Sequence, residues 1–323
     1  MKAIRFAKTG GPEVLSLQDI ALPPPAQGQV RIRHTAIGVN FIDTYHRSGL
    51  YPLPLPSGLG LEAAGTVESL GAGVTSLKIG DRVGYCTGPV GAYAEANNVP
   101  ADRVVKLPAS VGDDVAAAAM LKGMTVQDLL KRTFAVQRGQ AILFHSAAGG
   151  VGLIAVQWAK HMGAQVIGTV GSDSKIELAK AHGCDQVFNI EKDDWVAGVR
   201  ELTNGAGVPV VYDSIGKDTF MGSLDCLSPR GMMVSFGNSS GAVPPFEPAL
   251  LSAKGSLYLT RPTLMHYTRT ARELQETADD LFAVIGSGAV KIAVNQRFAL
   301  ADARAAHEAL HSRKTTGATV LIP

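Results

Sequence analysis

One stretch, residues 141–175, restricts the possible folds of this chain more than any other. It begins with the apolar run Ala141–Phe144, which has the length and composition of a buried strand. A turn of small residues follows, and apolar residues then recur at helical spacing up to Gly163, a residue type that often ends a helix. A second apolar run, Gln165–Val170, comes directly afterwards. The order strand, glycine turn, helix, strand predicts one unit of a doubly wound parallel sheet.

The glycines of this turn favour a site for a pyrophosphate. The turn reads Ala147-x-Gly149-x-x-Gly152, so alanine replaces the first glycine of the usual dinucleotide pattern. At a helix N-terminus the backbone N–H groups and the helix dipole attract an anion, and Gly149 and Gly150 let it approach closely. Gly152 would let the helix pack tightly on the strands. We therefore predict dinucleotide binding at Gly149 and Gly150; the alternative is a tight strand-to-helix turn without a ligand.

The residues after the second strand indicate which dinucleotide binds. Sites for NAD usually carry an acidic residue about 20 positions beyond the glycines, where it holds the ribose 2′-hydroxyl. Here the tip residue is Gly171, which leaves room for a 2′-phosphate. Ser172 could donate a hydrogen bond to that phosphate, and Lys175 supplies positive charge, so we favour NADPH. Two alternatives stay open: Asp173 could be the ribose ligand after all, and Lys175 could be an ordinary solvated lysine.

The composition is typical of a globular protein and argues against several other classes. The chain has 323 residues, more than one core usually serves, so we expect two domains. A net charge of +2 gives no reason to expect nucleic acid or a membrane as partner, and no apolar run reaches membrane-spanning length. The N-terminus lacks the apolar core of a signal peptide. Three widely spaced cysteines, Cys86, Cys184 and Cys226, indicate reduced thiols in a cytoplasmic protein.

Two regions of different pattern divide the chain. Up to about residue 120, alternating segments separated by turns predict a sheet-rich barrel, with strands at 2–6, 29–35 and 64–70. Beyond the alanine-rich helix that follows, helices alternate with strands, which predicts a parallel sheet with right-handed crossovers. We place the boundary close to Lys122 and Gly123. The last strand, Ala318–Ile322, is expected to return to the N-terminal domain.

The parallel sheet is expected to carry ligand contacts at its strand ends. We predict strands at 185–189, 208–212, 231–236 and 255–260, and helices at 175–182, 193–203 and 273–285, the second of these capped by Asp193. Ligands bind beyond the carboxyl ends of such strands. The residues found there are Ser214, Ile215, Phe236, Gly237 and Asn238. The alternative for each of them is an ordinary polar loop.

Five motifs carry a resemblance to a known family. They read GGPEVL at 10–15, GVNFID at 38–43, GLEAAG at 60–65, AAGGVG at 147–152 and FGNSSG at 236–241. In this order they resemble the zinc-free quinone oxidoreductase branch, similar to zeta-crystallin, of the medium-chain dehydrogenase/reductase superfamily. The resemblance covers essentially the whole chain. It implies an α/β protein in which a doubly wound Rossmann domain, 123–264, is inserted into a GroES-like β-rich catalytic domain, 1–122 and 265–323.

The resemblance also implies a set of cofactor contacts and a partner. By analogy the nicotinamide half of NADPH lies near Asn40, Phe41 and Thr125. The adenine is usually approached by a tyrosine whose position is Ile190 here. The family usually dimerises through the edge strand of the Rossmann sheet, here 255–260. The complete predicted cofactor set is Asn40, Phe41, Thr125, Gly149, Gly150, Val151, Gly171, Ser172, Lys175, Ser214, Ile215, Phe236, Gly237, Asn238, Ser239 and Arg313.

Zinc alcohol dehydrogenases of the same superfamily are the main competitor for this assignment. Their catalytic zinc is held with the help of a cysteine after the first catalytic strand and a glycine-histidine-glutamate motif. In this chain the cysteine position falls at Asn40, and the motif reads Gly60-Leu61-Glu62. A leucine cannot bind a metal, and Glu62 alone cannot make a site because catalytic zinc needs three protein ligands. We therefore expect no metal.

Without a metal, the expected substrate is an acceptor that is already electron-poor, such as a quinone, with hydride supplied by NADPH. The oxyanion that forms needs a hydrogen-bond donor or water. The candidates are Tyr45 and Tyr51, with Asn40 as a positioning group; the alternative for either tyrosine is a wall residue. Two other functions stay open, namely reduction of α,β-unsaturated aldehydes or ketones and a non-catalytic role in binding NADPH or nucleic acid. No basic stripe with interleaved aromatics supports nucleic acid.

Overall fold

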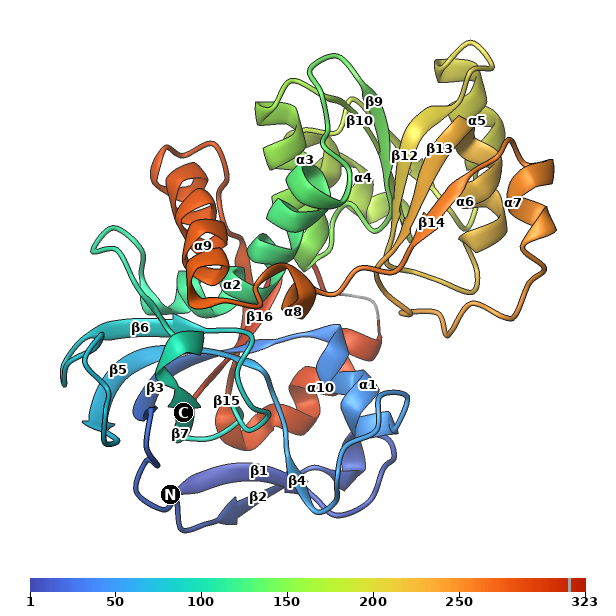
Figure 1. Cartoon of the computed structure of the whole chain (residues 1–323). Coiled ribbons are helices and arrows are strands. Elements are labelled where there is room, and N and C mark those ends of the chain that lie inside the picture. Colours follow the sequence, from blue (N-terminus) through green and yellow to red (C-terminus); the bar gives the residue numbers. More distant parts are fainter. Residues whose placement is uncertain (313–314) are drawn as a thin grey trace. The chain divides into compact units, whose positions relative to one another are not determined.

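A computed structural model of residues 1–312 and 315–323 contains two units that differ in strand direction (Figure 1). Unit 1 comprises Met1–Met124, Tyr267–Gly286 and Ile292–Pro323, and unit 2 comprises Thr125–His266 and Ser287–Lys291. The predicted Rossmann domain, 123–264, differs from unit 2 by two residues at each end and by the separate segment 287–291. These residues belong to unit 2 because Gln157 Nε2 donates to Lys291 O at 3.0 Å and Lys291 N donates to Gln157 Oε1 at 2.9 Å.

The sheet of unit 2 is parallel throughout, as its alternating pattern predicts. The strand order is β11-β10-β9-β12-β13-β14. The order reverses between β9 and β12, which is where ligands bind in sheets of this type. The strands are β9 (Ala141–Phe144), β10 (Gln165–Val170), β11 (Gln186–Asn189), β12 (Val208–Asp213), β13 (Leu227–Ser235) and β14 (Tyr258–Thr260).

Helices cover both faces of this sheet (Figure 1). Helices α3 (Gly150–His161) and α4 (Ile176–Ala181) lie on one face, and α5 (Trp195–Leu202) and α6 (Phe220–Cys226) lie on the other. A short 3-10 turn, Asp173–Lys175, precedes α4. Buried side chains of the central strands, such as Leu143 and Val211, pack in one cluster with those of α6. The remaining helices of this stretch are α7 (Ala249–Ala253) and α8 (Leu264–Tyr267).

Three predicted details of unit 2 are wrong for local reasons. β14 is shorter than predicted, because Gly255 and Ser256 have φ angles of 115° and 56°, which a strand does not allow. β13 begins at Leu227, before residue 231, since Leu227 pairs with Val208 at the start of β12 and the register shifts before the next pair. The cap of α5 is Asp194, whose carboxylate accepts a backbone N–H of the first turn at 3.0 Å. Asp193 instead accepts a backbone N–H at the end of β11, at 2.7 Å.

Unit 1 is built mainly on antiparallel pairs. One sheet has the order β15-β16-β3-β5-β6-β8, with β7 also paired to β3, and a smaller sheet has the order β2-β1-β4. Val320 of β16 lies opposite Gly38 of β3, which confirms that the last strand returns to the N-terminal region. The strands are β1 (Lys2–Phe6), β2 (Ser16–Asp19), β3 (Gln29–Val39), β4 (Ser57–Gly58), β5 (Glu62–Leu70), β6 (Arg82–Tyr85), β7 (Ala96–Pro100), β8 (Val105–Lys106), β15 (Val294–Ala299) and β16 (Ala318–Ile322).

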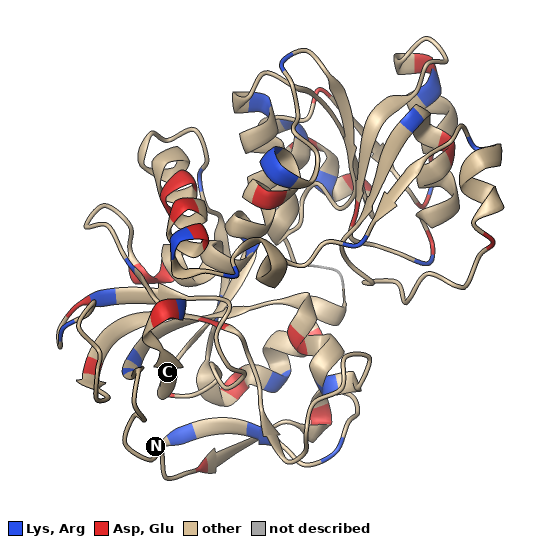
Figure 2. Ribbon diagram, in the orientation of Figure 1, with Lys and Arg blue, Asp and Glu red and all other residues tan. Residues whose placement is uncertain are grey.

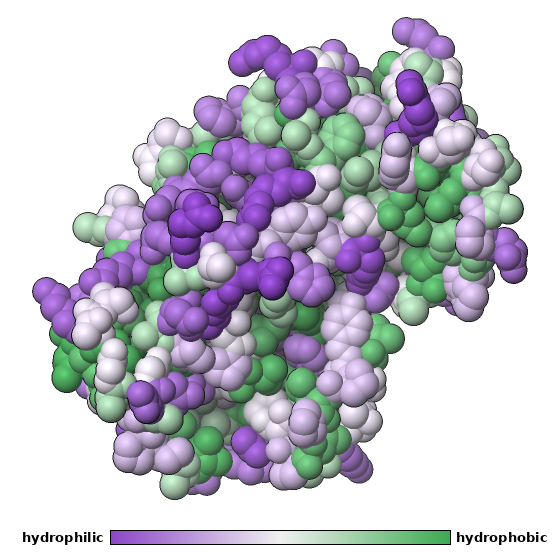
Figure 3. All heavy atoms as spheres, in the orientation of Figure 1, coloured by the Kyte–Doolittle hydropathy of each residue, from purple (hydrophilic) through white to green (hydrophobic). Residues whose placement is uncertain are grey.

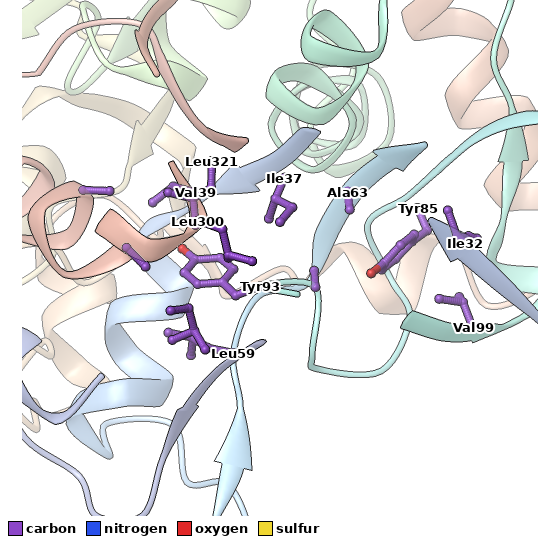
Figure 4. Close-up of a cluster of buried hydrophobic side chains, with 14 of the residues drawn as sticks. Ile32, Ile37, Val39, Leu59, Ala63, Tyr85, Tyr93, Val99, Leu300 and Leu321 are labelled. Carbon is purple, nitrogen blue, oxygen red and sulfur yellow. The ribbon is translucent and has the colours of Figure 1, made fainter. Parts of the chain in front are cut away.

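The interior of unit 1 combines both ends of the chain (Figure 4). Ile32, Ile37, Leu59, Tyr93 and Leu321 are each at most 1% exposed and belong to one cluster. Two of them come from β3, one from the C-terminal strand β16, and two from loops that flank β4 and β7. Burial of this kind supplies most of the favourable free energy of folding, so the C-terminal segment is an integral part of the unit.

Helices of unit 1 were predicted only in part. Helix α2 (Asp113–Gln127) runs across the predicted boundary and continues as a π-helical turn, Asp128–Thr133, and α9 (Ala271–Gly286) was expected. Helices α1 (Phe41–Ser48) and α10 (Ala303–His311) were not predicted, nor was β15. No helix among the described residues is both long enough and apolar enough to span a bilayer.

Candidate cofactor and active site

The turn between β9 and α3 requires glycine at position 152. A Cβ atom on Gly152 would lie 2.2 Å from Ser146 O and 2.7 Å from the carbonyl carbon of Ala147. Ala147 N donates to Thr169 O at 2.9 Å, which ties the turn to β10. A Cβ on Gly168 would lie only 2.8 Å from that of Ala147, so the strand glycine makes room for the alanine of the motif.

The N-terminus of α3 fits an anionic group. Gly149 occupies the N-cap position and has no side chain to cap the helix, and the first turn contains no acidic residue. The first N–H groups of a helix lack partners within it and carry the positive end of its dipole. Gly149, Gly150 and Val151 are all partly accessible. This end of the helix can therefore accept the pyrophosphate of a dinucleotide.

The tip of β10 is open, as the prediction of a 2′-phosphate site requires. A Cβ atom on Gly171 would meet no other atom within 4 Å. The hydroxyls of Ser172 and Ser174 lie 2.9 Å apart at the start of the following turn. Lys175 is half-buried, and burial lowers the pKa of its ammonium group. A bound anion would compensate this cation for its lost hydration.

Asp173, the alternative ribose ligand, is bound by two other side chains. Asn189 Nδ2 donates to its Oδ1 at 2.6 Å, and Lys192 Nζ donates to its Oδ2. The hydrogen bond from Lys192 is the main cause that lowers the pKa of Asp173. Both carboxylate oxygens thus have partners, one at the end of β11 and one in the loop between β11 and α5.

A buried carboxylate, Asp213, shapes the loop after β12. It is 0% exposed and accepts the backbone N–H groups of Ile215 and Gly216 at 2.7 and 3.0 Å. It also accepts the hydroxyls of Thr219 and Ser223 at 2.8 and 3.1 Å. Sequence reasoning missed this residue, although an acidic residue that directly ends an apolar strand at the ligand edge was a usable signal.

The loops after β12 and β13 lie against each other. Ser239 N donates to Ser214 O at 3.2 Å, and Ser240 N donates to Ile215 O at 2.9 Å. A Cβ atom on Gly237 would lie 2.4 Å from Ser214 O, so only glycine allows this approach. The structure therefore brings together the predicted residues of the two strand ends, which are Ser214, Ile215, Phe236, Gly237, Asn238 and Ser239.

In unit 1, the side chain of Asn40 is held by Glu62. Asn40 Nδ2 donates to Glu62 Oε2 at 2.8 Å, Lys122 Nζ donates to the same oxygen at 3.3 Å, and Leu121 N donates to Oε1 at 2.7 Å. Glu62 is 0% exposed. A Cβ atom on Gly38 would lie 2.1 Å from Oε2. The glutamate of the broken metal motif is thus a structural anchor, a role that sequence reasoning missed.

A second buried network holds the backbone of Asn40. Asp43 Oδ2 accepts Asn40 N at 2.8 Å and the hydroxyl of Tyr93 at 2.9 Å. Arg47 Nη1 donates to His307 Nδ1 at 2.9 Å, which leaves Nε2–H of His307 to donate to Tyr93, 3.1 Å away. Burial raises the pKa of Asp43 to about 7 and lowers that of His307 to about 3. The prediction did not include this network.

The two candidate hydrogen-bond donors for the oxyanion are neighbours. The ring centroids of Tyr45 and Tyr51 lie 5.2 Å apart at 65°, and Tyr51 N donates to Tyr45 O at 3.1 Å. The ring of His46 lies 6.3 Å from that of Tyr51. Phe41 is half-buried at the start of the same helix, and its carbonyl accepts the hydroxyl of Thr44 at 2.7 Å. One short helix and the loop after it therefore carry all four aromatic side chains.

The other predicted site residues fall in separate places. Thr125 is half-buried in the last turn of α2. Ile190 is half-buried beyond β11, and its N–H donates to Val170 O at 2.9 Å. Arg313 lies outside the described residues. Within the described part of the chain, no group of three or more His, Cys, Asp or Glu side chains is placed to hold a metal ion.

An open cavity of about 560 Å³ in unit 1 is not part of this site. It contains none of the predicted residues. Its charged side chains pair with one another, Arg82 with Asp113 at 2.5 Å and Arg297 with Asp114 at 2.6 Å. Within each pair the two opposite charges neutralise each other, so these four side chains present no net charge to a ligand.

Two domain families match the chain. The alcohol dehydrogenase GroES-like domain matches residues 26–109, and the family described as zinc-binding dehydrogenase matches residues 150–283. The first match lies in unit 1, and most of the second lies in unit 2, with residues 267–283 in unit 1. Together they reproduce the predicted combination of a GroES-like and a Rossmann domain.

Full-length relatives are similar over essentially the whole chain. A quinone oxidoreductase of Pseudomonas aeruginosa is 54% identical, with 100% of this chain and 99% of the relative covered. The crystal structure of Escherichia coli quinone oxidoreductase complexed with NADPH is 51% identical, covers 100% of both chains and has a TM-score of 0.99. A 2-haloacrylate reductase from Burkholderia sp. is 46% identical, with 98% of this chain and 97% of the relative covered.

Proposed function

Since the chain belongs to the quinone oxidoreductase branch of the medium-chain dehydrogenase/reductase superfamily, we propose that it reduces quinones with NADPH. The observation that carries this proposal is the uncapped N-terminus of α3 beside the open tip of β10, in a chain 51% identical to a quinone oxidoreductase crystallised with NADPH. The N-terminus of α3 offers a place for the pyrophosphate of the cofactor, and the tip of β10 offers one for its 2′-phosphate.

Each unit has one part in this function. Unit 2 binds NADPH, with the pyrophosphate at Gly149, Gly150 and Val151 and the 2′-phosphate at Ser172 and Lys175. The loops after β12 and β13 contribute to the ribose and nicotinamide side. Unit 1 is the catalytic unit, to which Asn40, Phe41, Tyr45 and Tyr51 belong. Thr125 and Arg313 complete the proposed cofactor set.

The reaction requires stabilisation of the oxygen on which negative charge develops. NADPH supplies the hydride when it is bound. Tyr45 or Tyr51 donates a hydrogen bond, and then a proton, to the quinone oxygen. Glu62 and Asp43 fix the amide and the backbone of Asn40, so this residue is pre-organised as a positioning group. A group already held in place needs no reorganisation when the charge forms.

We further propose a homodimer through the edge strand β14. Tyr258 on this strand is 61% exposed, and hydrophobic side chains gather over the part of unit 2 that contains β14 and α7 (Figure 3). Exposed sheet edges readily pair with another strand, and pairing two copies of the same edge gives a closed dimer.

The proposed setting is the cytoplasm, with a small molecule as the only substrate. All three cysteines are buried free thiols, which suits a reducing compartment. Basic and acidic residues are interspersed in both units (Figure 2), and the net charge is +2. Neither property favours nucleic acid as a partner.

The test is steady-state consumption of NADPH and NADH with 1,4-benzoquinone, with and without a chelator. We expect turnover that prefers NADPH and is insensitive to the chelator. The same assay with an α,β-unsaturated ketone and with 2-chloroacrylate tests the alternative suggested by the 2-haloacrylate reductase. Faster turnover of either compound than of the quinone would replace the proposed substrate class.

A further inference from the structure

Asp173 occupies a position that normally selects the other cofactor. It lies about 20 residues beyond the glycine turn and two residues after Gly171, close to the place where Rossmann domains specific for NAD carry the acidic residue that binds the ribose 2′-hydroxyl. A carboxylate there would repel a 2′-phosphate. A site for NADPH with Asp173 next to Ser172 therefore requires a positively charged group that neutralises this carboxylate.

Two residues at the end of β11 and in the loop that follows it bind the carboxylate of Asp173. Lys192 Nζ donates to Asp173 Oδ2, and Asn189 Nδ2 donates to Oδ1 at 2.6 Å. Asn189 is 2% exposed and is itself fixed. Its side-chain Oδ1 accepts the backbone N–H of Glu191 at 3.1 Å, and its own backbone N–H donates to Asp193 Oδ2 at 2.7 Å. The direction of its Nδ2 is therefore set, and Asp173 is drawn toward the end of β11.

The two partners of Asp173 have different effects. Asn189 is neutral and buried, so it orients the carboxylate without changing the local charge. Lys192 brings a full positive charge, and its side chain is 64% exposed at the surface of the loop. Of these two partners, only Lys192 carries a charge that neutralises Asp173.

We propose that Lys192 determines cofactor specificity by neutralising Asp173. With the carboxylate paired with Lys192, its charge no longer repels a 2′-phosphate bound at Ser172 and Lys175. Without Lys192, Asp173 would repel the phosphate and become available to the ribose hydroxyl of NADH. This inference rests on the proposed use of NADPH and adds a positioning residue to the 2′-phosphate site.

The first experiment measures direct binding of NADPH and NADH to Lys192→Met by isothermal titration calorimetry. One unshielded charge at a separation of several ångströms in water predicts an NADPH dissociation constant raised on the order of fivefold. NADH binding should be unchanged or tighter. The matched control is Lys180→Met, which removes another exposed lysine, one paired with Glu177 on α4. We expect it to change the ratio of the two constants by less than about twofold.

A double variant separates action through Asp173 from direct contact with the phosphate. In an Asp173→Asn background, Lys192→Met should no longer weaken NADPH binding, because there is no charge left to neutralise. A loss that persists in this background would mean that Lys192 binds the phosphate itself, and no loss in the single variant would equally overturn the proposal. Melting temperatures of all variants should match the wild type. A wild type that does not prefer NADPH would refute the proposed cofactor instead, so the two failures are distinguishable.

Discussion

Replacing Glu62 with Gln is expected to destabilise unit 1 by about 3 kcal/mol, because it leaves Lys122 buried without a counter-charge. Glu62 is 0% and Lys122 is 6% exposed, and Lys122 Nζ lies 3.3 Å from Glu62 Oε2. Removing one partner of a buried ion pair costs about 3–5 kcal/mol, and the long separation here suggests the lower value. Gln also offers one acceptor oxygen where three donors converge, namely Leu121 N, Lys122 Nζ and Asn40 Nδ2.

The measurement is the apparent melting temperature of the purified protein. For a unit of this size about 3 kcal/mol corresponds to a decrease of roughly 6–12 °C. The matched control is Glu68→Gln, the same substitution on the same strand at the surface pair with Arg33, where Glu68 is 34% exposed. Surface pairs contribute about 0–1 kcal/mol, so this variant should melt close to the wild type.

A second variant, Glu62→Gln with Lys122→Met, removes the unpaired charge as well. It should recover part of the lost stability, because an apolar replacement of a buried pair is often tolerated. Since Asn40 loses its anchor in both variants, kcat/KM with benzoquinone should stay low even where stability returns. If Glu62→Gln melted within about 2 °C of Glu68→Gln, the buried charge would not be the stabilising element, and the argument would fail.

Three further predictions test other parts of the site. Gly152→Ala should abolish NADPH binding, because its Cβ would lie 2.2 Å from Ser146 O, whereas Gly171→Ala meets no atom within 4 Å and should fold normally; circular dichroism and calorimetry would show both. Asp43 has a pKa of about 7 in the folded protein against 3.8 for the free group, so the folded state holds a proton that the unfolded chain has released. Wild-type stability should therefore fall relative to Asp43→Asn as pH rises from about 4 to 7, and parallel urea midpoints across this range would refute it. Tyr45→Phe and Tyr51→Phe should differ in kcat, with a loss of about 10²-fold for the residue that donates the proton; losses below about threefold in both would assign the proton to water.

The unit around β9, α3 and β10 could be predicted because its signals are local. An apolar run of strand length, a turn that admits only glycine at position 152, and Gly163 with a φ of 86° at the end of the helix fix its boundaries. Helix α1 was missed because it has only eight residues, and its three apolar or aromatic residues, Phe41, Ile42 and Tyr45, are too few to show a helical repeat. Other residues do mark the ends of this helix: Asn40 and Asp43 occupy capping positions at its start, and Gly49, with a φ of 85°, ends it.

The residues that hold the site in place could not be predicted for a different reason. Glu62 acts through residues 59 and 60 positions away, and Tyr93 contacts His307 across 214 positions. Such partners come together only in the folded chain, so neither periodicity nor motif spacing marks them. Asp173 shows the converse: its spacing predicts a ribose ligand, and only its contacts with Lys192 and Asn189 show that it is engaged elsewhere.

Three buried carboxylates have one physical task in common. Asp43, Glu62 and Asp213 are each 0% exposed, and each accepts at least one backbone N–H group. For Asp43 and Asp213 this group lies just after a strand, and for Glu62 it lies in α2. Where a strand gives way to a loop, the backbone loses its ladder partners, and a buried N–H without an acceptor is costly. A carboxylate can accept several such groups at once, which fixes a loop more firmly than a single neutral acceptor. Position 61 is leucine, so no metal-binding side chain precedes Glu62 in the sequence. The hydrogen bonds that Glu62 accepts from Asn40, Leu121 and Lys122 are sufficient to explain why this carboxylate is buried.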